Sequence, residues 1–131
     1  MIIDHIGVAV DNLEASIKFY TENFAASIEH REELPDRNLI LLFLSFGNTR
    51  LELLYPTGEG TIRKFLNNNG AGLHHICYKV DDIEAELVKF SKLGATLLDQ
   101  KPRTGAFGSK IAFIHPTSCG GVLTELCEYP K

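Results

Sequence analysis

Two histidines and two glutamates stand at matching places in the two halves of this 131-residue chain. His5 and His75 each lie in an apolar, strand-like run, and Glu52 and Glu125 each stand between apolar neighbours shortly before a Tyr-Pro dipeptide. A carboxylate inside an apolar strand is costly to bury without a partner. Two imidazoles and two carboxylates suit a divalent ion such as Co, Ni, Zn or Mn, with water or substrate oxygens completing an octahedron. A coordination position left open in this way is typical of a catalytic metal rather than a structural one.

These side chains belong to an internal repeat. Residues 3–20 read IDHIGVAVDNLEASIKFY and residues 73–90 read LHHICYKVDDIEAELVKF, so the second phrase follows the first at a shift of 70 positions. Such self-similarity determines the architecture and is interpreted before any single element. The identical pairs are His5 and His75, Ile6 and Ile76, Val10 and Val80, Asp11 and Asp81, Glu14 and Glu84, and Ala15 and Ala85.

Each repeat begins with a strand that alternates at period two. In the first, HIGVAV, this places His5 on the face opposite Ile6, and His75 has the same parity in HICYKV. His74 has the opposite parity and is not expected to bind a metal. His30 and His115 have no partner in the repeat, and we expect them to be structural or to line a substrate site.

A helix follows each of these strands. Asp11 and Asp81 are candidate N-caps, with Glu14 and Glu84 three residues later in the capping-box position. Gly94 suits the position just past the end of the second helix. The expected buried stripes are Leu13, Ile17, Tyr20 and Phe24 in the first helix, and Ile83, Leu87 and Phe90 in the second.

Three further strands are expected after each helix, at about 26–33, 39–46 and 50–55 in the first half and 95–100, 110–115 and 121–128 in the second. A turn is expected at Gly47-Asn48, and a short helix at residues 61–66. The fold class is therefore α+β, as one domain over residues 1–131: a βαβββ module at 1–57, a connecting helical segment at 58–70, and a second βαβββ module at 71–131. If the two curved sheets pack with approximate two-fold symmetry, the four side chains converge in one cleft.

Each of these residue types also has a structural interpretation. A lone histidine at a strand start is more often structural than a metal ligand, and a lone strand glutamate is usually solvated; their symmetric recurrence favours a metal site. The net charge of −4 gives no basic face for nucleic acid, and no apolar run reaches the roughly 20 residues that cross a bilayer. Three cysteines without CxxC spacing are expected to be free, buried thiols, which fits a cytoplasmic location.

The repeat with its four ligands resembles the vicinal oxygen chelate superfamily, which includes glyoxalase I, bleomycin resistance proteins and ring-cleaving dioxygenases. Within it the chain is most similar to the methylmalonyl-CoA epimerase family, through IDHIGVAV, GNTRLELLYP, AGLHHICYKVDDIEA and KIAFIHPTSCGGVLTEL. The resemblance implies a divalent metal held by His5, Glu52, His75 and Glu125, an acyl-CoA substrate, a homodimer, and epimerisation at C2 by removal and return of a proton. Some relatives carry a glutamate base where this chain has Leu41, so Glu125 and Glu52 are the implied catalytic bases.

The resemblance leaves rivals. A glyoxalase I-type lactoylglutathione lyase, or another isomerase of the superfamily, would use the same four ligands. A ferrous dioxygenase typically uses two histidines and one carboxylate, which Glu52 argues against, and a metal-free binding module would lack the ligand set. Contacts to coenzyme A phosphates are open: Lys101, Arg103 and Lys110 are candidates, against the alternative of a solvated basic loop.

Overall fold

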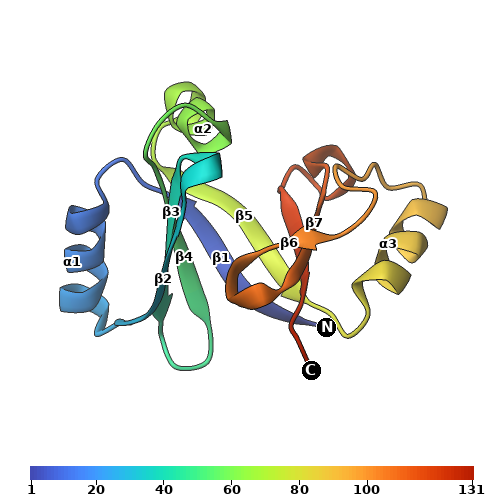
Figure 1. The fold of residues 1–131 in the computed structure, drawn as a ribbon, viewed down its shortest axis with the longest axis horizontal. Helices are drawn as coiled ribbons and strands as arrows, with labels where there is room; N and C mark the ends of the chain where they lie inside the picture. Colours follow the sequence, from blue (N-terminus) through green and yellow to red (C-terminus); the bar gives the residue numbers. More distant parts are fainter. The chain divides into compact units, whose positions relative to one another are not determined.

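A computed structural model describes residues 1–131, and the chain divides into two compact units (Figure 1). The first unit is His5–His74, and the second combines Met1–Asp4 with His75–Lys131. None of the helices is both long enough and apolar enough to pass through a bilayer. The elements in chain order are β1 (Ile2–Ala9), α1 (Leu13–Phe24), β2 (Ser27–Leu34), β3 (Leu39–Ser45), β4 (Arg50–Pro56), α2 (Thr61–Asn69), β5 (Gly72–Lys79), α3 (Ile83–Lys92), β6 (Arg103–Thr104), β7 (Lys110–Ile114) and β8 (Thr124–Glu128).

In the first unit the strands lie in the order β2-β3-β4-β1. β1 is parallel to β4, and β3 is antiparallel to both β2 and β4. Helix α1 lies along one face of these strands (Figure 1). The core on that face consists of Val10, Leu13, Ala26, Ile40, Leu42, Leu44 and Leu53, with Ile17 and Tyr20 packed against it. Because side chains alternate along a strand, Leu41 and Phe43 of β3 point to the other face.

The second unit repeats this plan with α3 in the place of α1. Its strands lie in the order β5-β8-β7-β6, with β5 parallel to β8, and β7 antiparallel to β8 and β6. The core against α3 consists of Val80, Ile83, Leu87, Ala112, Ile114 and Leu126. The predicted α+β class, with the βαβββ order in each half, is confirmed.

Both repeat helices begin one residue later than the repeat predicts. The caps are Asn12 and Asp82, whose side chains accept hydrogen bonds from the backbone N–H groups of Ala15 and Ala85. The prediction of Asp11 and Asp81 was therefore wrong. The helices start at the first apolar residue that packs on the sheet, so the residue just before it becomes the cap.

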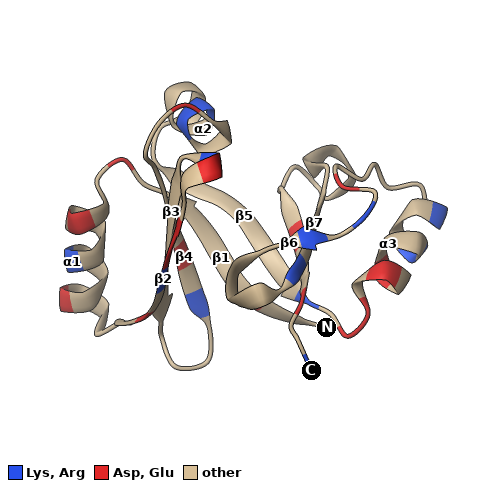
Figure 2. Cartoon of the chain, viewed as in Figure 1, with Lys and Arg blue, Asp and Glu red and all other residues tan.

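The charges on α3 complement its dipole. Glu84 and Glu86 lie in its first turn, and Lys89 and Lys92 lie in its last (Figure 2). Negative charge near a helix N-terminus and positive charge near its C-terminus are both stabilising. Gly94 follows the helix with φ of 92°, as expected for a residue that ends it.

Two further expectations differ from the structure. Residues 95–100 form no strand: Leu97 makes a single bridge to Ile114, and the Asp99 carboxylate accepts the backbone N–H of Phe113 at 2.8 Å. The Asp99 carboxylate thus accepts the hydrogen bond that a backbone carbonyl of a neighbouring strand would accept. The strand that pairs with β7 at this edge is the two-residue β6. Phe24 is 56% exposed, because α1 ends at this residue and its ring lies at the rim of the core.

Two short predictions in the first half hold. The 46–49 turn is closed by a hydrogen bond from Phe46 N–H to the Thr49 carbonyl, with Gly47 at φ of 100°. The connecting helix exists and runs beyond the expected 61–66, as α2.

Candidate functional site

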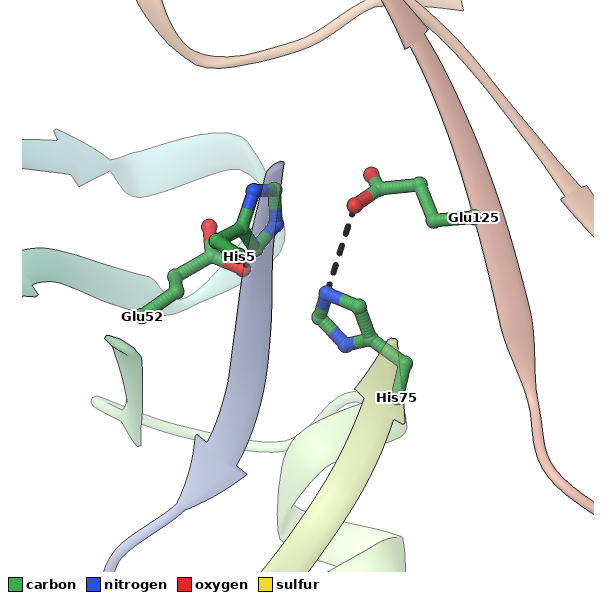
Figure 3. Close-up of side chains that lie close together, drawn as sticks. All are labelled: His5, Glu52, His75 and Glu125. Atoms are coloured by element: carbon green, nitrogen blue, oxygen red, sulfur yellow. Dashed lines mark ion pairs between the residues drawn. The ribbon is translucent and has the colours of Figure 1, made fainter. Parts of the chain in front are cut away.

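In the first unit, His5 of β1 and Glu52 of β4 form a buried pair (Figure 3). The His5 Nε2 lies 3.4 Å from the Glu52 Oε1, and the residues are 5% and 6% exposed. The two strands are parallel, and Glu52 is paired with Gly7 of β1. His5 therefore lies two residues before the residue that pairs with Glu52. The face of β1 that carries His5 is the more buried face of the strand.

The second unit contains the same arrangement. The His75 Nε2 of β5 lies 3.2 Å from the Glu125 Oε1 of β8, the pair joined by the dashed line in Figure 3. Cys77 lies opposite Glu125, so this histidine also stands two residues before the cross-strand neighbour. His75 and Glu125 are 4% and 5% exposed. Each half of the repeat therefore builds one His–Glu pair in the same strand register.

A phenylalanine ring supports each histidine. Phe43 of β3 meets the His5 ring edge-on, with centroids 5.3 Å apart, and Phe113 of β7 meets the His75 ring at 5.6 Å. Each ring also lies opposite the glutamate of its pair, in the registers Phe43–Glu52 and Phe113–Glu125. Sequence reasoning missed these rings, although their numbers differ by the repeat shift of 70, which was the available signal.

An arginine guanidinium also lies over each phenylalanine ring. The Arg50 guanidinium carbon lies 5.0 Å from the Phe43 centroid, and that of Arg103 lies 5.5 Å from the Phe113 centroid. Arg50 also pairs with Glu29 at 3.4 Å, and Arg103 with Asp99 at 3.2 Å. Each arginine thereby contacts both a supporting ring and a carboxylate of its own unit.

The donor set fits a metal ion. His5, Glu52, His75 and Glu125 are residues that could hold one, and all four are buried. Nitrogen and carboxylate ligands lie about 2.0–2.2 Å from such an ion. Two neighbouring ligands are then separated by about 3.0–3.5 Å, depending on coordination geometry. The spacings of 3.4 and 3.2 Å within the two pairs fall in that range.

The other histidines have local roles. The His74 ring packs edge-on against Phe65 of α2 at 4.9 Å. The His115 Nδ1 accepts the backbone N–H of Thr117, which caps a short 3₁₀ turn. His30 instead pairs with a carboxylate, because its Nε2 lies 3.0 Å from the Oε1 of Glu32 on the same strand, β2.

The cysteines are free, as predicted, with Cys77 and Cys127 buried and Cys119 half-buried. Burial raises the pKa of the Cys77 thiol, and the hydrogen bond with the Cys127 side chain and the negative charge of Glu125 raise it further. A thiol is nucleophilic only as the thiolate. Burial and these two neighbours therefore disfavour the nucleophilic form of Cys77.

The candidate coenzyme A contacts are surface side chains. Lys101 and Lys110 are exposed, and Lys110 Nζ lies 3.9 Å from a Glu128 carboxylate oxygen. Arg103 forms an ion pair with Asp99. Their role toward a cofactor phosphate stays a prediction.

Known proteins are similar to this chain in sequence and fold. The family description "Glyoxalase/Bleomycin resistance protein/Dioxygenase superfamily" matches residues 4–113. The mitochondrial methylmalonyl-CoA epimerase of Homo sapiens is 38% identical over 126 residues, covering 95% of this chain and 72% of that protein. The ethylmalonyl-CoA/methylmalonyl-CoA epimerase of Cereibacter sphaeroides is 39% identical over 127 residues, 95% of each chain. A variant of the Streptomyces coelicolor methylmalonyl-CoA epimerase, solved in complex with 2-nitronate-propionyl-CoA, superposes with a TM-score of 0.92 at 34% identity, covering 97% of this chain and 93% of that one.

Proposed function

Because the chain belongs to the glyoxalase/bleomycin resistance protein/dioxygenase superfamily and, within it, to the methylmalonyl-CoA epimerase family, we propose that it interconverts the (R) and (S) epimers of methylmalonyl-CoA. The protein is then an isomerase whose substrate is an acyl-CoA. The observation that carries the proposal is the identity of 38–39% to named epimerases over 95% of the chain. The two buried His–Glu pairs supply the chemistry that such a reaction needs.

The proposed metal ligands are His5, Glu52, His75 and Glu125, around a single divalent ion in one cleft of the 1–131 domain. Co, Ni, Zn and Mn all suit two imidazoles and two carboxylates. When bound, such an ion acts as a Lewis acid that stabilises the negative charge developing on the thioester oxygen. The proposal is supported by the equal register of the two pairs and by their 3.4 and 3.2 Å spacings.

The chain's own groups move the proton and shape the site. A carboxylate takes the proton from C2, and its return on the opposite face inverts the centre. Glu125 and Glu52 are the proposed acceptors, because each is a buried carboxylate paired with a histidine of the proposed site. Phe43 and Phe113 fix the imidazole rings of their pairs. No nucleophile is required.

Isotope exchange tests the activity. Purified protein loaded with each divalent ion in turn is incubated with (2R)- or (2S)-methylmalonyl-CoA in deuterated water. We expect deuterium to enter C2, with formation of the other epimer. Turnover of only the methylglyoxal–glutathione adduct, with no exchange into methylmalonyl-CoA, would instead establish a lactoylglutathione lyase.

Metal stoichiometry tests the shared site. One ion per chain is expected, and His5→Ala and His75→Ala should each abolish it, because the ion needs ligands from both pairs. Lys110→Ala, which changes an exposed side chain, is the matched control. Two ions per chain, with one retained in either histidine variant, would show that the pairs act separately.

The assembly and location complete the proposal. We expect a homodimer in the cytoplasm. Light scattering coupled to size-exclusion chromatography should give twice the chain mass of 14.6 kDa, and a monomer mass would contradict the dimer.

A further inference from the structure

A third His–Glu pair lies in the first unit, outside the proposed metal site. The His30 Nε2 and the Glu32 Oε1 are 3.0 Å apart, and their side chains are 31% and 30% exposed. A carboxylate can only accept a hydrogen bond. In the tautomer that carries the proton on Nε2, His30 donates this hydrogen bond and holds the Glu32 oxygen beside its ring.

The register places this pair on the face of the sheet that carries His5 and Glu52. His30 lies opposite Phe43, which in turn lies opposite Glu52, so the three side chains form one row across β2, β3 and β4. Glu32 lies in the next row, opposite Leu41. The other face is covered by α1 and its core, and the β2 residues on that side, Arg31 and Glu33, are exposed.

A β-bulge sets this orientation. The register of β2 against β3 shifts between Ile28 and His30, so that Glu29 is the extra residue. Bulges redirect side chains and are frequent next to active sites. Here the bulge brings Glu29 to Arg50, which covers Phe43, and places the His30 ring 6.2 Å from the same Phe43. Phe43 thus contacts both the His5 ring and the His30 ring.

Position 41 itself offers no base. Leu41 is 5% exposed, and its neighbours in the row are Leu54 and Glu32. Adjacent strands are about 4.8 Å apart, which a glutamate side chain spans. Glu32 is therefore the carboxylate in the row of Leu41, and Glu52 lies in the row beside it.

We propose that Glu32 is a catalytic base for one face of the acyl-CoA substrate and that His30 is the positioning residue that holds its carboxylate. This rests on the proposed function. The C2–H bond breaks, its electron pair moves into the thioester carbonyl, and the proton passes to the Glu32 carboxylate. The reverse transfer restores the C2–H bond, and a carboxylate of the metal-site pairs serves the opposite face.

Glu32→Gln tests the base, with Glu33→Gln as the matched control, because Glu33 is an exposed side chain on the other face of the same strand. A general base contributes about 10²–10⁴-fold to rate, so we expect kcat for epimerisation to fall at least about 100-fold. KM and metal content should stay within about twofold, because Glu32 is outside the ligand set. Wild-type kcat in Glu32→Gln, with the wild-type protein active, overturns the inference and leaves the proposed function intact; an inactive wild-type protein defeats the proposed function itself.

His30→Ala and His30→Gln separate positioning from folding. Since the glutamine amide can donate to the Glu32 oxygen as the imidazole does, His30→Gln should retain most of the kcat that His30→Ala loses. Equal losses in both variants contradict the positioning role.

Chemical labelling gives a readout that needs no turnover. A water-soluble carbodiimide with an amine should modify Glu32 and Glu33 in the protein alone, detected by peptide mass spectrometry. Saturating 2-nitronate-propionyl-CoA should protect Glu32 at least about fivefold and leave Glu33 unprotected. Equal labelling of Glu32 with and without the ligand would show that it does not touch the acyl group.

Discussion

Replacing Phe43 by leucine tests whether the rings that support the histidines control metal binding. Phe43 is 1% exposed, its ring meets His5 edge-on at 5.3 Å, and the Arg50 guanidinium lies 5.0 Å from its centroid. Leucine keeps an apolar side chain in the core while removing both ring contacts.

The stability cost follows from those contacts. An aromatic pair is worth about 0.5–1.5 kcal/mol, and a partly exposed cation–π contact about 0.5–1 kcal/mol. The smaller volume of leucine in this buried position adds about 0.5–1.5 kcal/mol. We expect the free energy of unfolding to fall by roughly 2–3 kcal/mol, within the 5–15 kcal/mol that domains typically have. The variant should therefore fold.

The functional effect is a separate quantity. Groups that orient a metal ligand typically control about 10–100-fold of metal affinity. We expect about a tenfold loss in Phe43→Leu, since the ring makes no hydrogen bond to His5. Isothermal titration with Zn²⁺ or Co²⁺ measures the affinity, and urea unfolding of the metal-free protein measures the stability.

The control is Leu44→Ala, at the adjacent residue on the opposite face of β3, which is 0% exposed. It should lose about 2–5 kcal/mol of stability and keep wild-type metal affinity. Unchanged metal affinity in Phe43→Leu would refute the reasoning that the ring orients His5. An equal loss of affinity in Leu44→Ala would also refute it, because the effect would then follow stability alone.

Three further results are expected. Glu125→Gln should abolish interconversion of the epimers and weaken metal binding less than His75→Ala, since an amide still ligates weakly and cannot accept a proton; full epimerase activity would make Glu125 only a ligand. Asp82→Ala should lower the urea-derived free energy of unfolding by about 1 kcal/mol, whereas Asp81→Ala, next to the cap, should change it by less than about 0.5 kcal/mol. The raised pKa of Cys77 means that above the ordinary thiol value of 9.0 the unfolded chain loses a proton that the folded protein keeps. The free energy of unfolding should then fall as pH rises beyond that value, by up to about 1.4 kcal/mol per pH unit, and Cys77→Ala should remove this part of the slope in urea titrations at several pH values.

Much of the local structure could be predicted because it depends on short-range periodicity. The alternation in HIGVAV and HICYKV placed His5 and His75 on one face of each strand, and the repeat gave both modules the same order of elements. The helix starts were missed by one residue, because a cap is chosen by where the first apolar side chain meets the sheet. The expected strand at 95–100 was wrong, because the Asp99 carboxylate takes the hydrogen bond that a strand carbonyl would accept.

The sequence by itself determined the repeat, the fold class and the four histidines and glutamates, since each follows from residue types at fixed spacings. Only the tertiary structure decided what stands beside them. The Phe43 and Phe113 rings and the His30–Glu32 pair are brought to the site face by strand register, and register depends on pairing between segments distant in the chain. A single bulge at Glu29 sets which β2 residues share the face of His5, and no local pattern in SIEHREEL encodes that shift.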